Sequence, residues 1–230
     1  MSLKITKLLI IGFVGLLLIG CKFSMRSEIY ISDVEALATS DTQMLFVNTQ
    51  LKLEMPSEEE CQNKAGEIIE MLSQYFEEVT NPQCVTEGFS GYLLLDVKIP
   101  MVKYKGEETD VPTKGFYRFY VTQEEGISYL LALLDREEFD RFNQRVKEKF
   151  FDSIAPEDLT IEFVVRNDSR KKIRVTGYSA YMNGTPIFDS GFVDLENREN
   201  LEILLSRIHT DYFYSQDDVI VASFGKPEEE

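Results

Sequence analysis

Residues that commonly perform catalysis are sparse in this sequence. It contains one histidine, His209, and no serine or cysteine is spaced to form a nucleophilic pair with it. The aromatic run 212–214 beside His209 is more typical of a packed or rim histidine than of a general base. The run Gly88-Phe-Ser-Gly91 fails as a G-x-S-x-G nucleophile elbow, because the next residue is Tyr92 and the surrounding pattern is that of a strand. We therefore predict no catalytic residue and no enzymatic activity.

Carboxylates are abundant, but their spacing does not indicate a metal site. The chain contains 40 Asp and Glu residues. Neither the pair Asp217-Asp218 nor the group of Glu107, Glu108 and Asp110 follows the oxygen-ligand pattern of a calcium loop, so we interpret both as solvated turns. A hydrolase that works with two carboxylates ranks last among our hypotheses, because nothing in the sequence selects the pair. We predict no metal and no cofactor.

Residues 1–20 have the pattern of an export signal. Lys4 and Lys7 precede an uncharged run from Leu8 to Gly20. This matches the charged and apolar regions of a secretory signal, and the run is shorter than the roughly 20 residues that span a bilayer. We predict that residues 1–20 are a signal peptide that is cut off, with an uncleaved helical anchor as the alternative. In both cases the rest of the chain lies outside the cytoplasm.

The end of this segment, Leu18-Ile-Gly-Cys21, resembles the lipobox of bacterial lipoproteins. The resemblance implies cleavage before Cys21 and lipidation of its sulfur, so that residues 21–26 form a tether to the membrane. In that family an aspartate after the cysteine favours retention in the inner membrane. Because Lys22 stands there, the resemblance implies the periplasmic face of the outer membrane, with the inner membrane as the less favoured location.

The charge balance limits the partners that we expect. The net charge is −16, which argues against nucleic acid and against anionic lipid surfaces, because both attract clusters of Lys and Arg. The one basic cluster is Arg170-Lys-Lys172 with Arg174. It could touch lipid headgroups near the anchor, or it could protect a sheet edge from pairing with another chain.

Two cysteines remain if Cys21 carries lipid. Cys61 and Cys84 form an even pair in an exported chain, so we predict a disulfide. A helix that starts at Cys61 rises about 24 Å, and an extended return to Cys84 covers about 20 Å, so that the two sulfurs come back to the same level. The alternative, a metal pair, lacks the further Cys or His ligands that zinc requires.

The first half of the body predicts strands around one helix. Val47, Thr49 and Leu51 alternate with polar residues over 45–55, which is the period of a half-buried strand. Ser57 and Glu60 have the spacing of a capping box that opens a helix. The remaining expected elements are a strand at 28–31, a capping box at 32–35 that opens a helical turn through Leu37, and a long strand from Phe89 to Met101.

This region also resembles an uncharacterised family of small lipoproteins in proteobacteria and their phages. The likeness covers residues 27–102. It is carried by Pro56-Ser-Glu-Glu-Glu-Cys61, Cys84-Val-Thr-Glu-Gly88 and Val97-Lys-Ile-Pro-Met-Val102. It implies a lipidated start and paired cysteines, and it implies no activity.

The second half predicts helices and a meander. We expect a strand at 116–121, a helix that Thr122 caps and that continues through Leu134, and a second helical stretch from Asp135 with inward Phe139, Phe142, Val146 and Phe150. Strands at 159–165 and 173–182 follow, and then an Asn183-Gly184 hairpin and a return strand at 187–195. A last helix at 198–209 precedes a strand at 219–224.

The fold class that we expect is α+β, with antiparallel sheet and helices packed on one face. The polar segment from Lys103 to Lys114 predicts a hinge between two lobes, 27–104 and 114–225, and residues 226–230 form an acidic tail that frays. The leading functional hypothesis is a non-catalytic lipoprotein that binds a protein partner or serves the envelope or a phage. The alternative is a carrier of a small apolar ligand such as lipid, bound between strands and helices.

Overall fold

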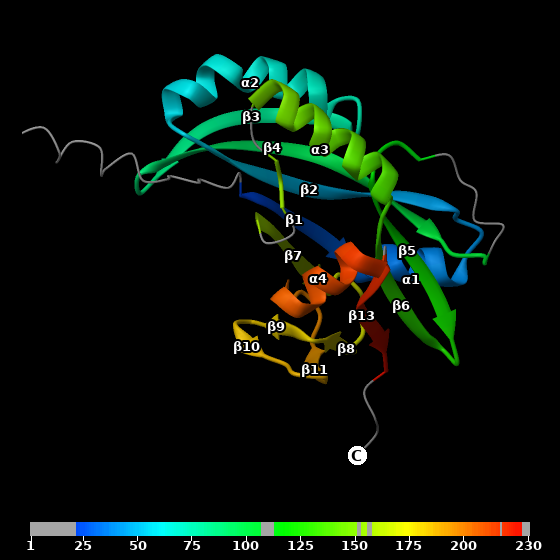
Figure 1. The fold of residues 1–230 in the computed structure, drawn as a ribbon. Coiled ribbons are helices and arrows are strands. Elements are labelled where there is room, and N and C mark those ends of the chain that lie inside the picture. Colours follow the sequence, from blue (N-terminus) through cyan, green and yellow to red (C-terminus); the bar gives the residue numbers. More distant parts are fainter. Residues whose placement is uncertain (1–21, 107–112, 151–152, 156–157, 217, 227–230) are drawn as a thin grey trace, which may run out of the picture.

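The structure is a computed structural model that describes residues 22–106, 113–150, 153–155, 158–216 and 218–226. These residues form one mixed sheet with four helices, and strands dominate (Figure 1). The helices are α1 Ile31–Thr39, α2 Glu58–Leu72, α3 Arg136–Phe150 and α4 Arg207–Gln216. The strands are β1 Phe23–Tyr30, β2 Met44–Met55, β3 Glu77–Glu87, β4 Ser90–Lys103, β5 Tyr117–Glu124, β6 Ile127–Leu134, β7 Leu159–Arg166, β8 Ile173–Tyr178, β9 Ala180–Met182, β10 Thr185–Pro186, β11 Ser190–Leu195, β12 Asn200–Leu205 and β13 Asp218–Gly225.

The sheet contains parallel as well as antiparallel neighbours. Its order is β10-β9-β12-β7-β1-β2-β4-β5-β6-β13-β8-β11, with β3 beside β4. β1 pairs with β7 in parallel, Phe23 opposite Leu159, and β4 pairs with β5 in parallel. The antiparallel pairing that we expected therefore holds for the other strand pairs but not for these two. Parallel neighbours need long connections, so no local sequence pattern reveals that β1 and β7 lie side by side.

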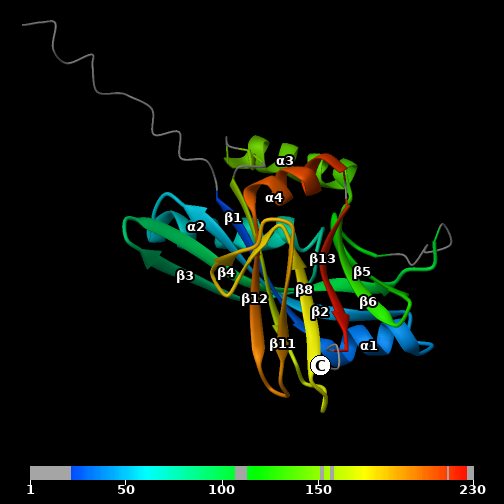
Figure 2. The ribbon, with the colours of Figure 1, turned by 90° about the horizontal axis from the view of Figure 1, so that it is seen from below.

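The sheet curls into a half-barrel, because both of its ends meet on one stretch of chain, 173–182. β8 pairs with β13, and β9, which follows after one residue, pairs with β12 (Figure 2). The residue between them, Ser179, has a φ of 43°, a left-handed conformation that bends the strand at this point. The two ends of the sheet are thus joined by a single bent strand.

A cluster of aromatic rings fills the space between the sheet and α3. The Phe116 ring centroid lies 5.1 Å from that of Phe76, 5.3 Å from that of Phe139 and 5.0 Å from that of Phe142. The predicted inward stripe of α3 is confirmed at Phe139, Phe142 and Val146, which are all buried. Tyr75 also packs its ring on Phe142, so residues from both expected lobes build this cluster.

The helices cover the buried face of the sheet at different places. α2 packs on β3 and β4, and the chain that follows it meets α3, where Arg145 lies over the Tyr75 ring. α4 connects β12 to β13 and lies beside α3, where the Tyr214 ring packs on Phe139 (Figure 2). α1 packs on β1, β5 and β6. Its start is held by Asp168, which accepts bonds from the Ser32 amide and hydroxyl, and not by the expected capping box.

Residues 127–134 form strand β6, so the helix that we expected there is wrong. Glu125 and Gly126 have φ values of 50° and 82°, which is typical of a type I′ hairpin turn between β5 and β6. Side chains at every second position, from Ser128 to Leu134, are buried. The run Ile-Ser-Tyr-Leu-Leu-Ala-Leu-Leu is apolar at almost every position, and such a run does not distinguish a buried strand from a helix.

Residues 200–205 also form a strand, β12, where we expected a helix over 198–209. Leu201, Ile203 and Leu205 are buried and alternate with Glu202 and Leu204. The helix α4 begins only at Arg207. The Asn183-Gly184 hairpin is confirmed, with φ values of 47° and 77° at its two residues.

The N-terminal strand is longer than we expected. Residues 23–26, which we placed in the tether, form the first half of β1, and Phe23 and Met25 are buried at 1% and 3% exposure. The sheet also continues across the boundary that we expected between the lobes, because β4 pairs with β5. Residues 107–112 of the predicted hinge lie outside the described residues.

Candidate functional site

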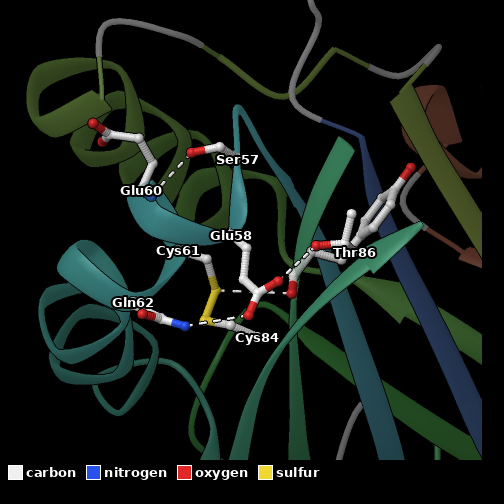
Figure 3. Close-up of a disulfide and its surroundings, with 8 residues drawn as sticks. Ser57, Glu58, Glu60, Cys61, Gln62, Cys84 and Thr86 are labelled. Atoms are coloured by element: carbon white, nitrogen blue, oxygen red, sulfur yellow. Dashed lines mark hydrogen bonds between the residues drawn. A yellow bond between two sulfur atoms is a disulfide. The ribbon is translucent and has the colours of Figure 1, made fainter. Parts of the chain in front are cut away.

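The predicted disulfide between Cys61 and Cys84 is confirmed, and it joins α2 to β3 (Figure 3). The two Cα atoms lie 5.9 Å apart, and Cys61 is fully buried. The start of α2 is fixed next to it, because the Ser57 hydroxyl accepts a bond from the Glu60 amide, as the capping box predicted. Glu58 accepts a 2.7 Å bond from the Thr86 hydroxyl of β3, so a second contact supports the covalent one.

Several predicted site residues cannot be placed. Cys21, the predicted lipidation site, lies outside the described residues, as do Glu107, Glu108, Asp110 and Asp217. Within the described ranges, no group of three or more His, Cys, Asp or Glu side chains is arranged to hold a metal ion. In the same ranges, none of the helices combines the length and the apolar character needed to cross a bilayer.

His209 supports the fold at the bend between β8 and β9. Its side chain is 8% exposed and lies against the backbone carbonyls of Tyr178 and Ser179. Burial lowers the pKa of His209 below its usual 6.5, although these carbonyls favour the charged imidazolium. The position agrees with the packed histidine that the sequence indicated.

The basic cluster lies at the end of the sheet opposite the start of β1. Lys171 and Lys172 line a hollow of about 460 Å³ together with Lys226. Arg174 is held by both carboxylate oxygens of Asp194, at 2.8 and 3.2 Å, on the neighbouring strand β11. Because β8 pairs with β11 on one side and with β13 on the other, this ion pair lies within the sheet and not on an edge strand.

A polar hollow lies on the exposed face of the sheet, and we call it the polar groove. Its volume is about 540 Å³. It is lined by Arg26 and Glu28 from β1, Asn48, Thr49 and Gln50 from β2, Glu78, Thr80 and Asn81 from β3, and Asp96, Val97 and Lys98 from β4. Strand alternation places these polar side chains there, because Asn48 and Gln50 alternate with the buried Val47 and Leu51.

The edge strand β3 is irregular where it lines the polar groove. Its pairing with β4 shifts register twice, between Glu77 and Thr80 and between Thr80 and Gln83. Glu78 and Asn81 have φ values of 49° and 52°, which side chains other than glycine seldom adopt. Bulges and left-handed residues of this kind are often found at functional sites, where they redirect side chains.

Contacts inside the polar groove hold its side chains in place. The Asn81 amide donates a 2.8 Å bond to the Asp96 carboxylate. Arg26 lies 2.8 Å from both Glu162 and Glu202 on the neighbouring strands, so its charge is largely compensated. Burial raises the pKa of Glu162, and the charge of Arg26 opposes that rise. The lining itself carries three carboxylates and two cations, so the groove is slightly acidic.

The chemistry of this lining suits the binding of a polar ligand. Amide, carboxylate and guanidinium groups offer donors and acceptors to a polar ligand. The lining residues include no His, Cys or Ser that could act as a nucleophile or neutral base. Sequence analysis missed this groove, because Asn48 and Gln50 read as an ordinary solvated strand face. The nearest signal was Asn81-Pro82, a pair that favours irregular backbone and lies where β3 shifts register.

A second, apolar hollow of about 460 Å³ lies between the β9–β10 hairpin and the start of α4. Phe188 is 96% exposed and Ile208 is 78% exposed, and both line it. Tyr181, Pro186 and Ile187 complete its apolar lining. Large apolar side chains that are exposed together commonly mark a binding surface.

Comparison with known proteins identifies a domain family, but the function of that family is unknown. A domain family of unknown function, DUF7424, matches residues 23–226, while no curated protein and no solved structure matches the chain. The family description names neither lipoproteins nor phages, so the two resemblances drawn from residues 18–21 and 27–102 stay predictions. Because the match covers most of the 230 residues, the chain belongs to the DUF7424 family of domains of unknown function.

Proposed function

We propose that this chain is an exported, non-catalytic lipoprotein, held by Cys21 at the periplasmic face of the outer membrane, that binds a protein partner in the polar groove. The Cys61–Cys84 disulfide supports export, because such bonds persist in oxidising compartments. The leader 1–20 and the lipobox pattern support the anchor.

The observation that carries the binding role is the Asn81–Asp96 contact inside the bulged part of β3. β3 is an edge strand, and its bulges expose two unusual backbone positions, Glu78 and Asn81, to the groove. The Asn81 amide is exposed and held by Asp96, so a ligand meets it without further ordering, which favours affinity.

The charge of the groove indicates the chemistry of the partner. The chain carries 40 acidic and 24 basic side chains, and the groove lining is itself slightly acidic. Complementary charge speeds encounter and suppresses wrong partners. The occupant is therefore a polar protein segment that carries lysine or arginine, and its binding weakens as salt rises.

The test is crosslinking capture from envelope extracts with matched variants. The double variant Asn81→Ala with Asp96→Ala removes the groove contact. The control is Gln144→Ala with Glu148→Ala, which removes an exposed amide–carboxylate bond of 2.9 Å on α3. We expect a captured protein to be lost with the groove variant and kept with the control. Equal capture by both variants would reject the groove as the binding site.

The anchor has its own test, mass spectrometry of the mature N-terminus. We expect a chain that begins at Cys21 and carries acyl groups. A chain that still begins at Met1, without lipid, would reject the lipoprotein assignment and leave the groove result untouched.

The apolar hollow favours a second function, carriage of a small apolar ligand. The rings around Phe116 fill the space between α3 and the sheet, so such a ligand would bind at Phe188 and Ile208. Titration with a neutral fluorescent apolar probe tests it. Binding that persists after Phe188→Ser with Ile208→Ser would exclude this site.

A further inference from the structure

Phe89 is the most exposed of the exposed large hydrophobic side chains, at 105% relative exposure. It occupies the tip of the β3–β4 hairpin, after Gly88, whose φ of 62° makes the turn. A phenyl ring held at a hairpin tip, away from the core, contributes nothing to packing. The position of Phe89 in the sheet indicates which surface its ring can contact.

The strand register places Phe89 at the end of the sheet where the chain enters. Phe23 of β1 is opposite Leu53 of β2, and Leu53 is opposite Leu93 of β4. Phe89 lies four residues before Leu93, so the tip projects about 13 Å beyond the level of Phe23 and sits about 10 Å to the side. Cys21 is two residues before Phe23.

We propose that Phe89 is a second membrane contact, which enters the headgroup region of the bilayer beside the lipid on Cys21. This inference rests on the proposed lipid anchor. A chain lipidated at Cys21 has only Lys22 between the anchor and a strand whose first residue is buried, so this end of the sheet is held against the membrane. The aromatic tip is the part that projects furthest there, and aromatic rings favour the membrane interface.

The charges around the tip select the lipid. Glu58 and Glu59 of α2 are exposed, and they begin α2 at the same end of the sheet, because Met55 is opposite Gly91. Glu87 next to the tip is paired with Lys52 at 2.5 Å. An acidic surround is repelled by anionic lipid. The contact therefore favours zwitterionic headgroups such as phosphatidylethanolamine.

The chain contains no tryptophan, so a single Phe→Trp substitution gives a clean fluorescent reporter. Phe89→Trp is compared with Phe46→Trp in the full mature lipoprotein, reconstituted in vesicles of zwitterionic lipid with brominated acyl chains. Phe46 is 45% exposed on β2, opposite Pro100 of β4, and lies about 36 Å from the tip along the strands. We expect blue-shifted, bromine-quenched emission from the Phe89→Trp protein and unquenched emission from the Phe46→Trp protein.

Each outcome decides between the two proposals. An acylated protein in which both reporters stay unquenched overturns the membrane contact and leaves the anchor standing. A Phe89→Trp emission that is blue-shifted but not quenched places the tip against protein and overturns it as well. A chain without acyl groups overturns the proposed anchor and this inference together. Adding anionic lipid is expected to reduce the quenching, and stronger quenching would contradict the charge argument.

Discussion

The two faces of the sheet differ in what holds them and in what they can do. On the buried face, Leu51 and Leu95 lie beneath helices and interlocked rings, and almost no polar group is exposed. On the other face of the same two strands, Gln50 and Asp96 point into the polar groove. The buried face determines stability, whereas the exposed face presents polar side chains to solvent. The following predictions test this division, from the largest expected effect to the smallest.

Gly115→Ala should destabilise the protein most. An added Cβ at Gly115 would overlap the backbone carbonyl of Tyr75, and the φ of 92° is left-handed as well. We expect a loss of about 4 kcal/mol in the free energy of unfolding, measured by denaturant titration. Gly126→Ala is the matched control, with a φ of 82° and open space around it, and should cost about 1–2 kcal/mol. Similar losses in the two variants would show that backbone strain, and not packing, decides.

Cys61→Ala tests the link between the two faces, because the disulfide holds the strand that supplies Asn81. We expect a loss of about 3 kcal/mol under oxidising conditions and little change under reducing ones. Partner capture should fall in parallel, since β3 is then held by non-covalent contacts alone. Equal unfolding curves in both conditions would mean that the bridge does not form in solution.

The substitution His209→Gln tests whether the buried histidine makes the stability of the protein depend on pH. The pKa of His209 is lowered in the folded state, so below its usual 6.5 the unfolded chain binds more protons than the folded one. The contribution of His209 to stability is therefore fully present above about pH 6.5 and is lost as the pH falls below this value. Thermal unfolding across this range should show a weaker decline for His209→Gln. An unchanged decline would assign the effect to other groups.

The contribution of Asp33 to stability has the opposite pH dependence to that of His209. Burial and the neighbouring Asp168 raise the pKa of Asp33, so its folded form holds a proton more readily than its unfolded form. Asp33 therefore favours the folded state more as the pH falls towards the pKa of its carboxyl group. The substitution Asp33→Asn should remove this dependence on pH and should improve stability slightly at neutral pH. Melting temperatures at pH 4 and pH 7 check this.

Asn48→Ala should have the smallest effect on stability and a clear effect on binding. Asn48 is exposed on β2 and lines the groove. We expect a change within about 0.5 kcal/mol in unfolding and reduced capture of the partner. Full capture with Asn48→Ala would restrict the binding surface to β3 and β4.

The sequence predicted those elements whose pattern is local. The inward residues of β2 and β4, the Ser57 cap and the Asn183-Gly184 turn all follow from spacing within a few residues, and each is present. β6 and β12 were misread, because short Leu-rich runs fit both a strand and a helix. In β6 the overlooked signal was Glu125-Gly126, a two-residue turn that favours a hairpin.

The groove could not be predicted, because it depends on which strands lie side by side. Arg26 meets Glu162 and Glu202, and Asn81 meets Asp96, only after β7, β12 and β3 have taken their places in the sheet. No alternation within a single strand contains that information. The disulfide was predictable because cysteine is rare and chemically selective, whereas asparagine and aspartate are common on any solvated strand.

The parallel pairing of β1 with β7 also determines when the sheet can be completed during synthesis. Because synthesis starts at the N-terminus, Phe23 is made long before Leu159, the residue opposite it in β7. Until then the first strand lacks a neighbour on one edge, and the core lacks the buried Phe163 and Val165 of β7. Delay of this kind is useful to a polypeptide that must be threaded through a narrow channel, because premature compaction would block its passage.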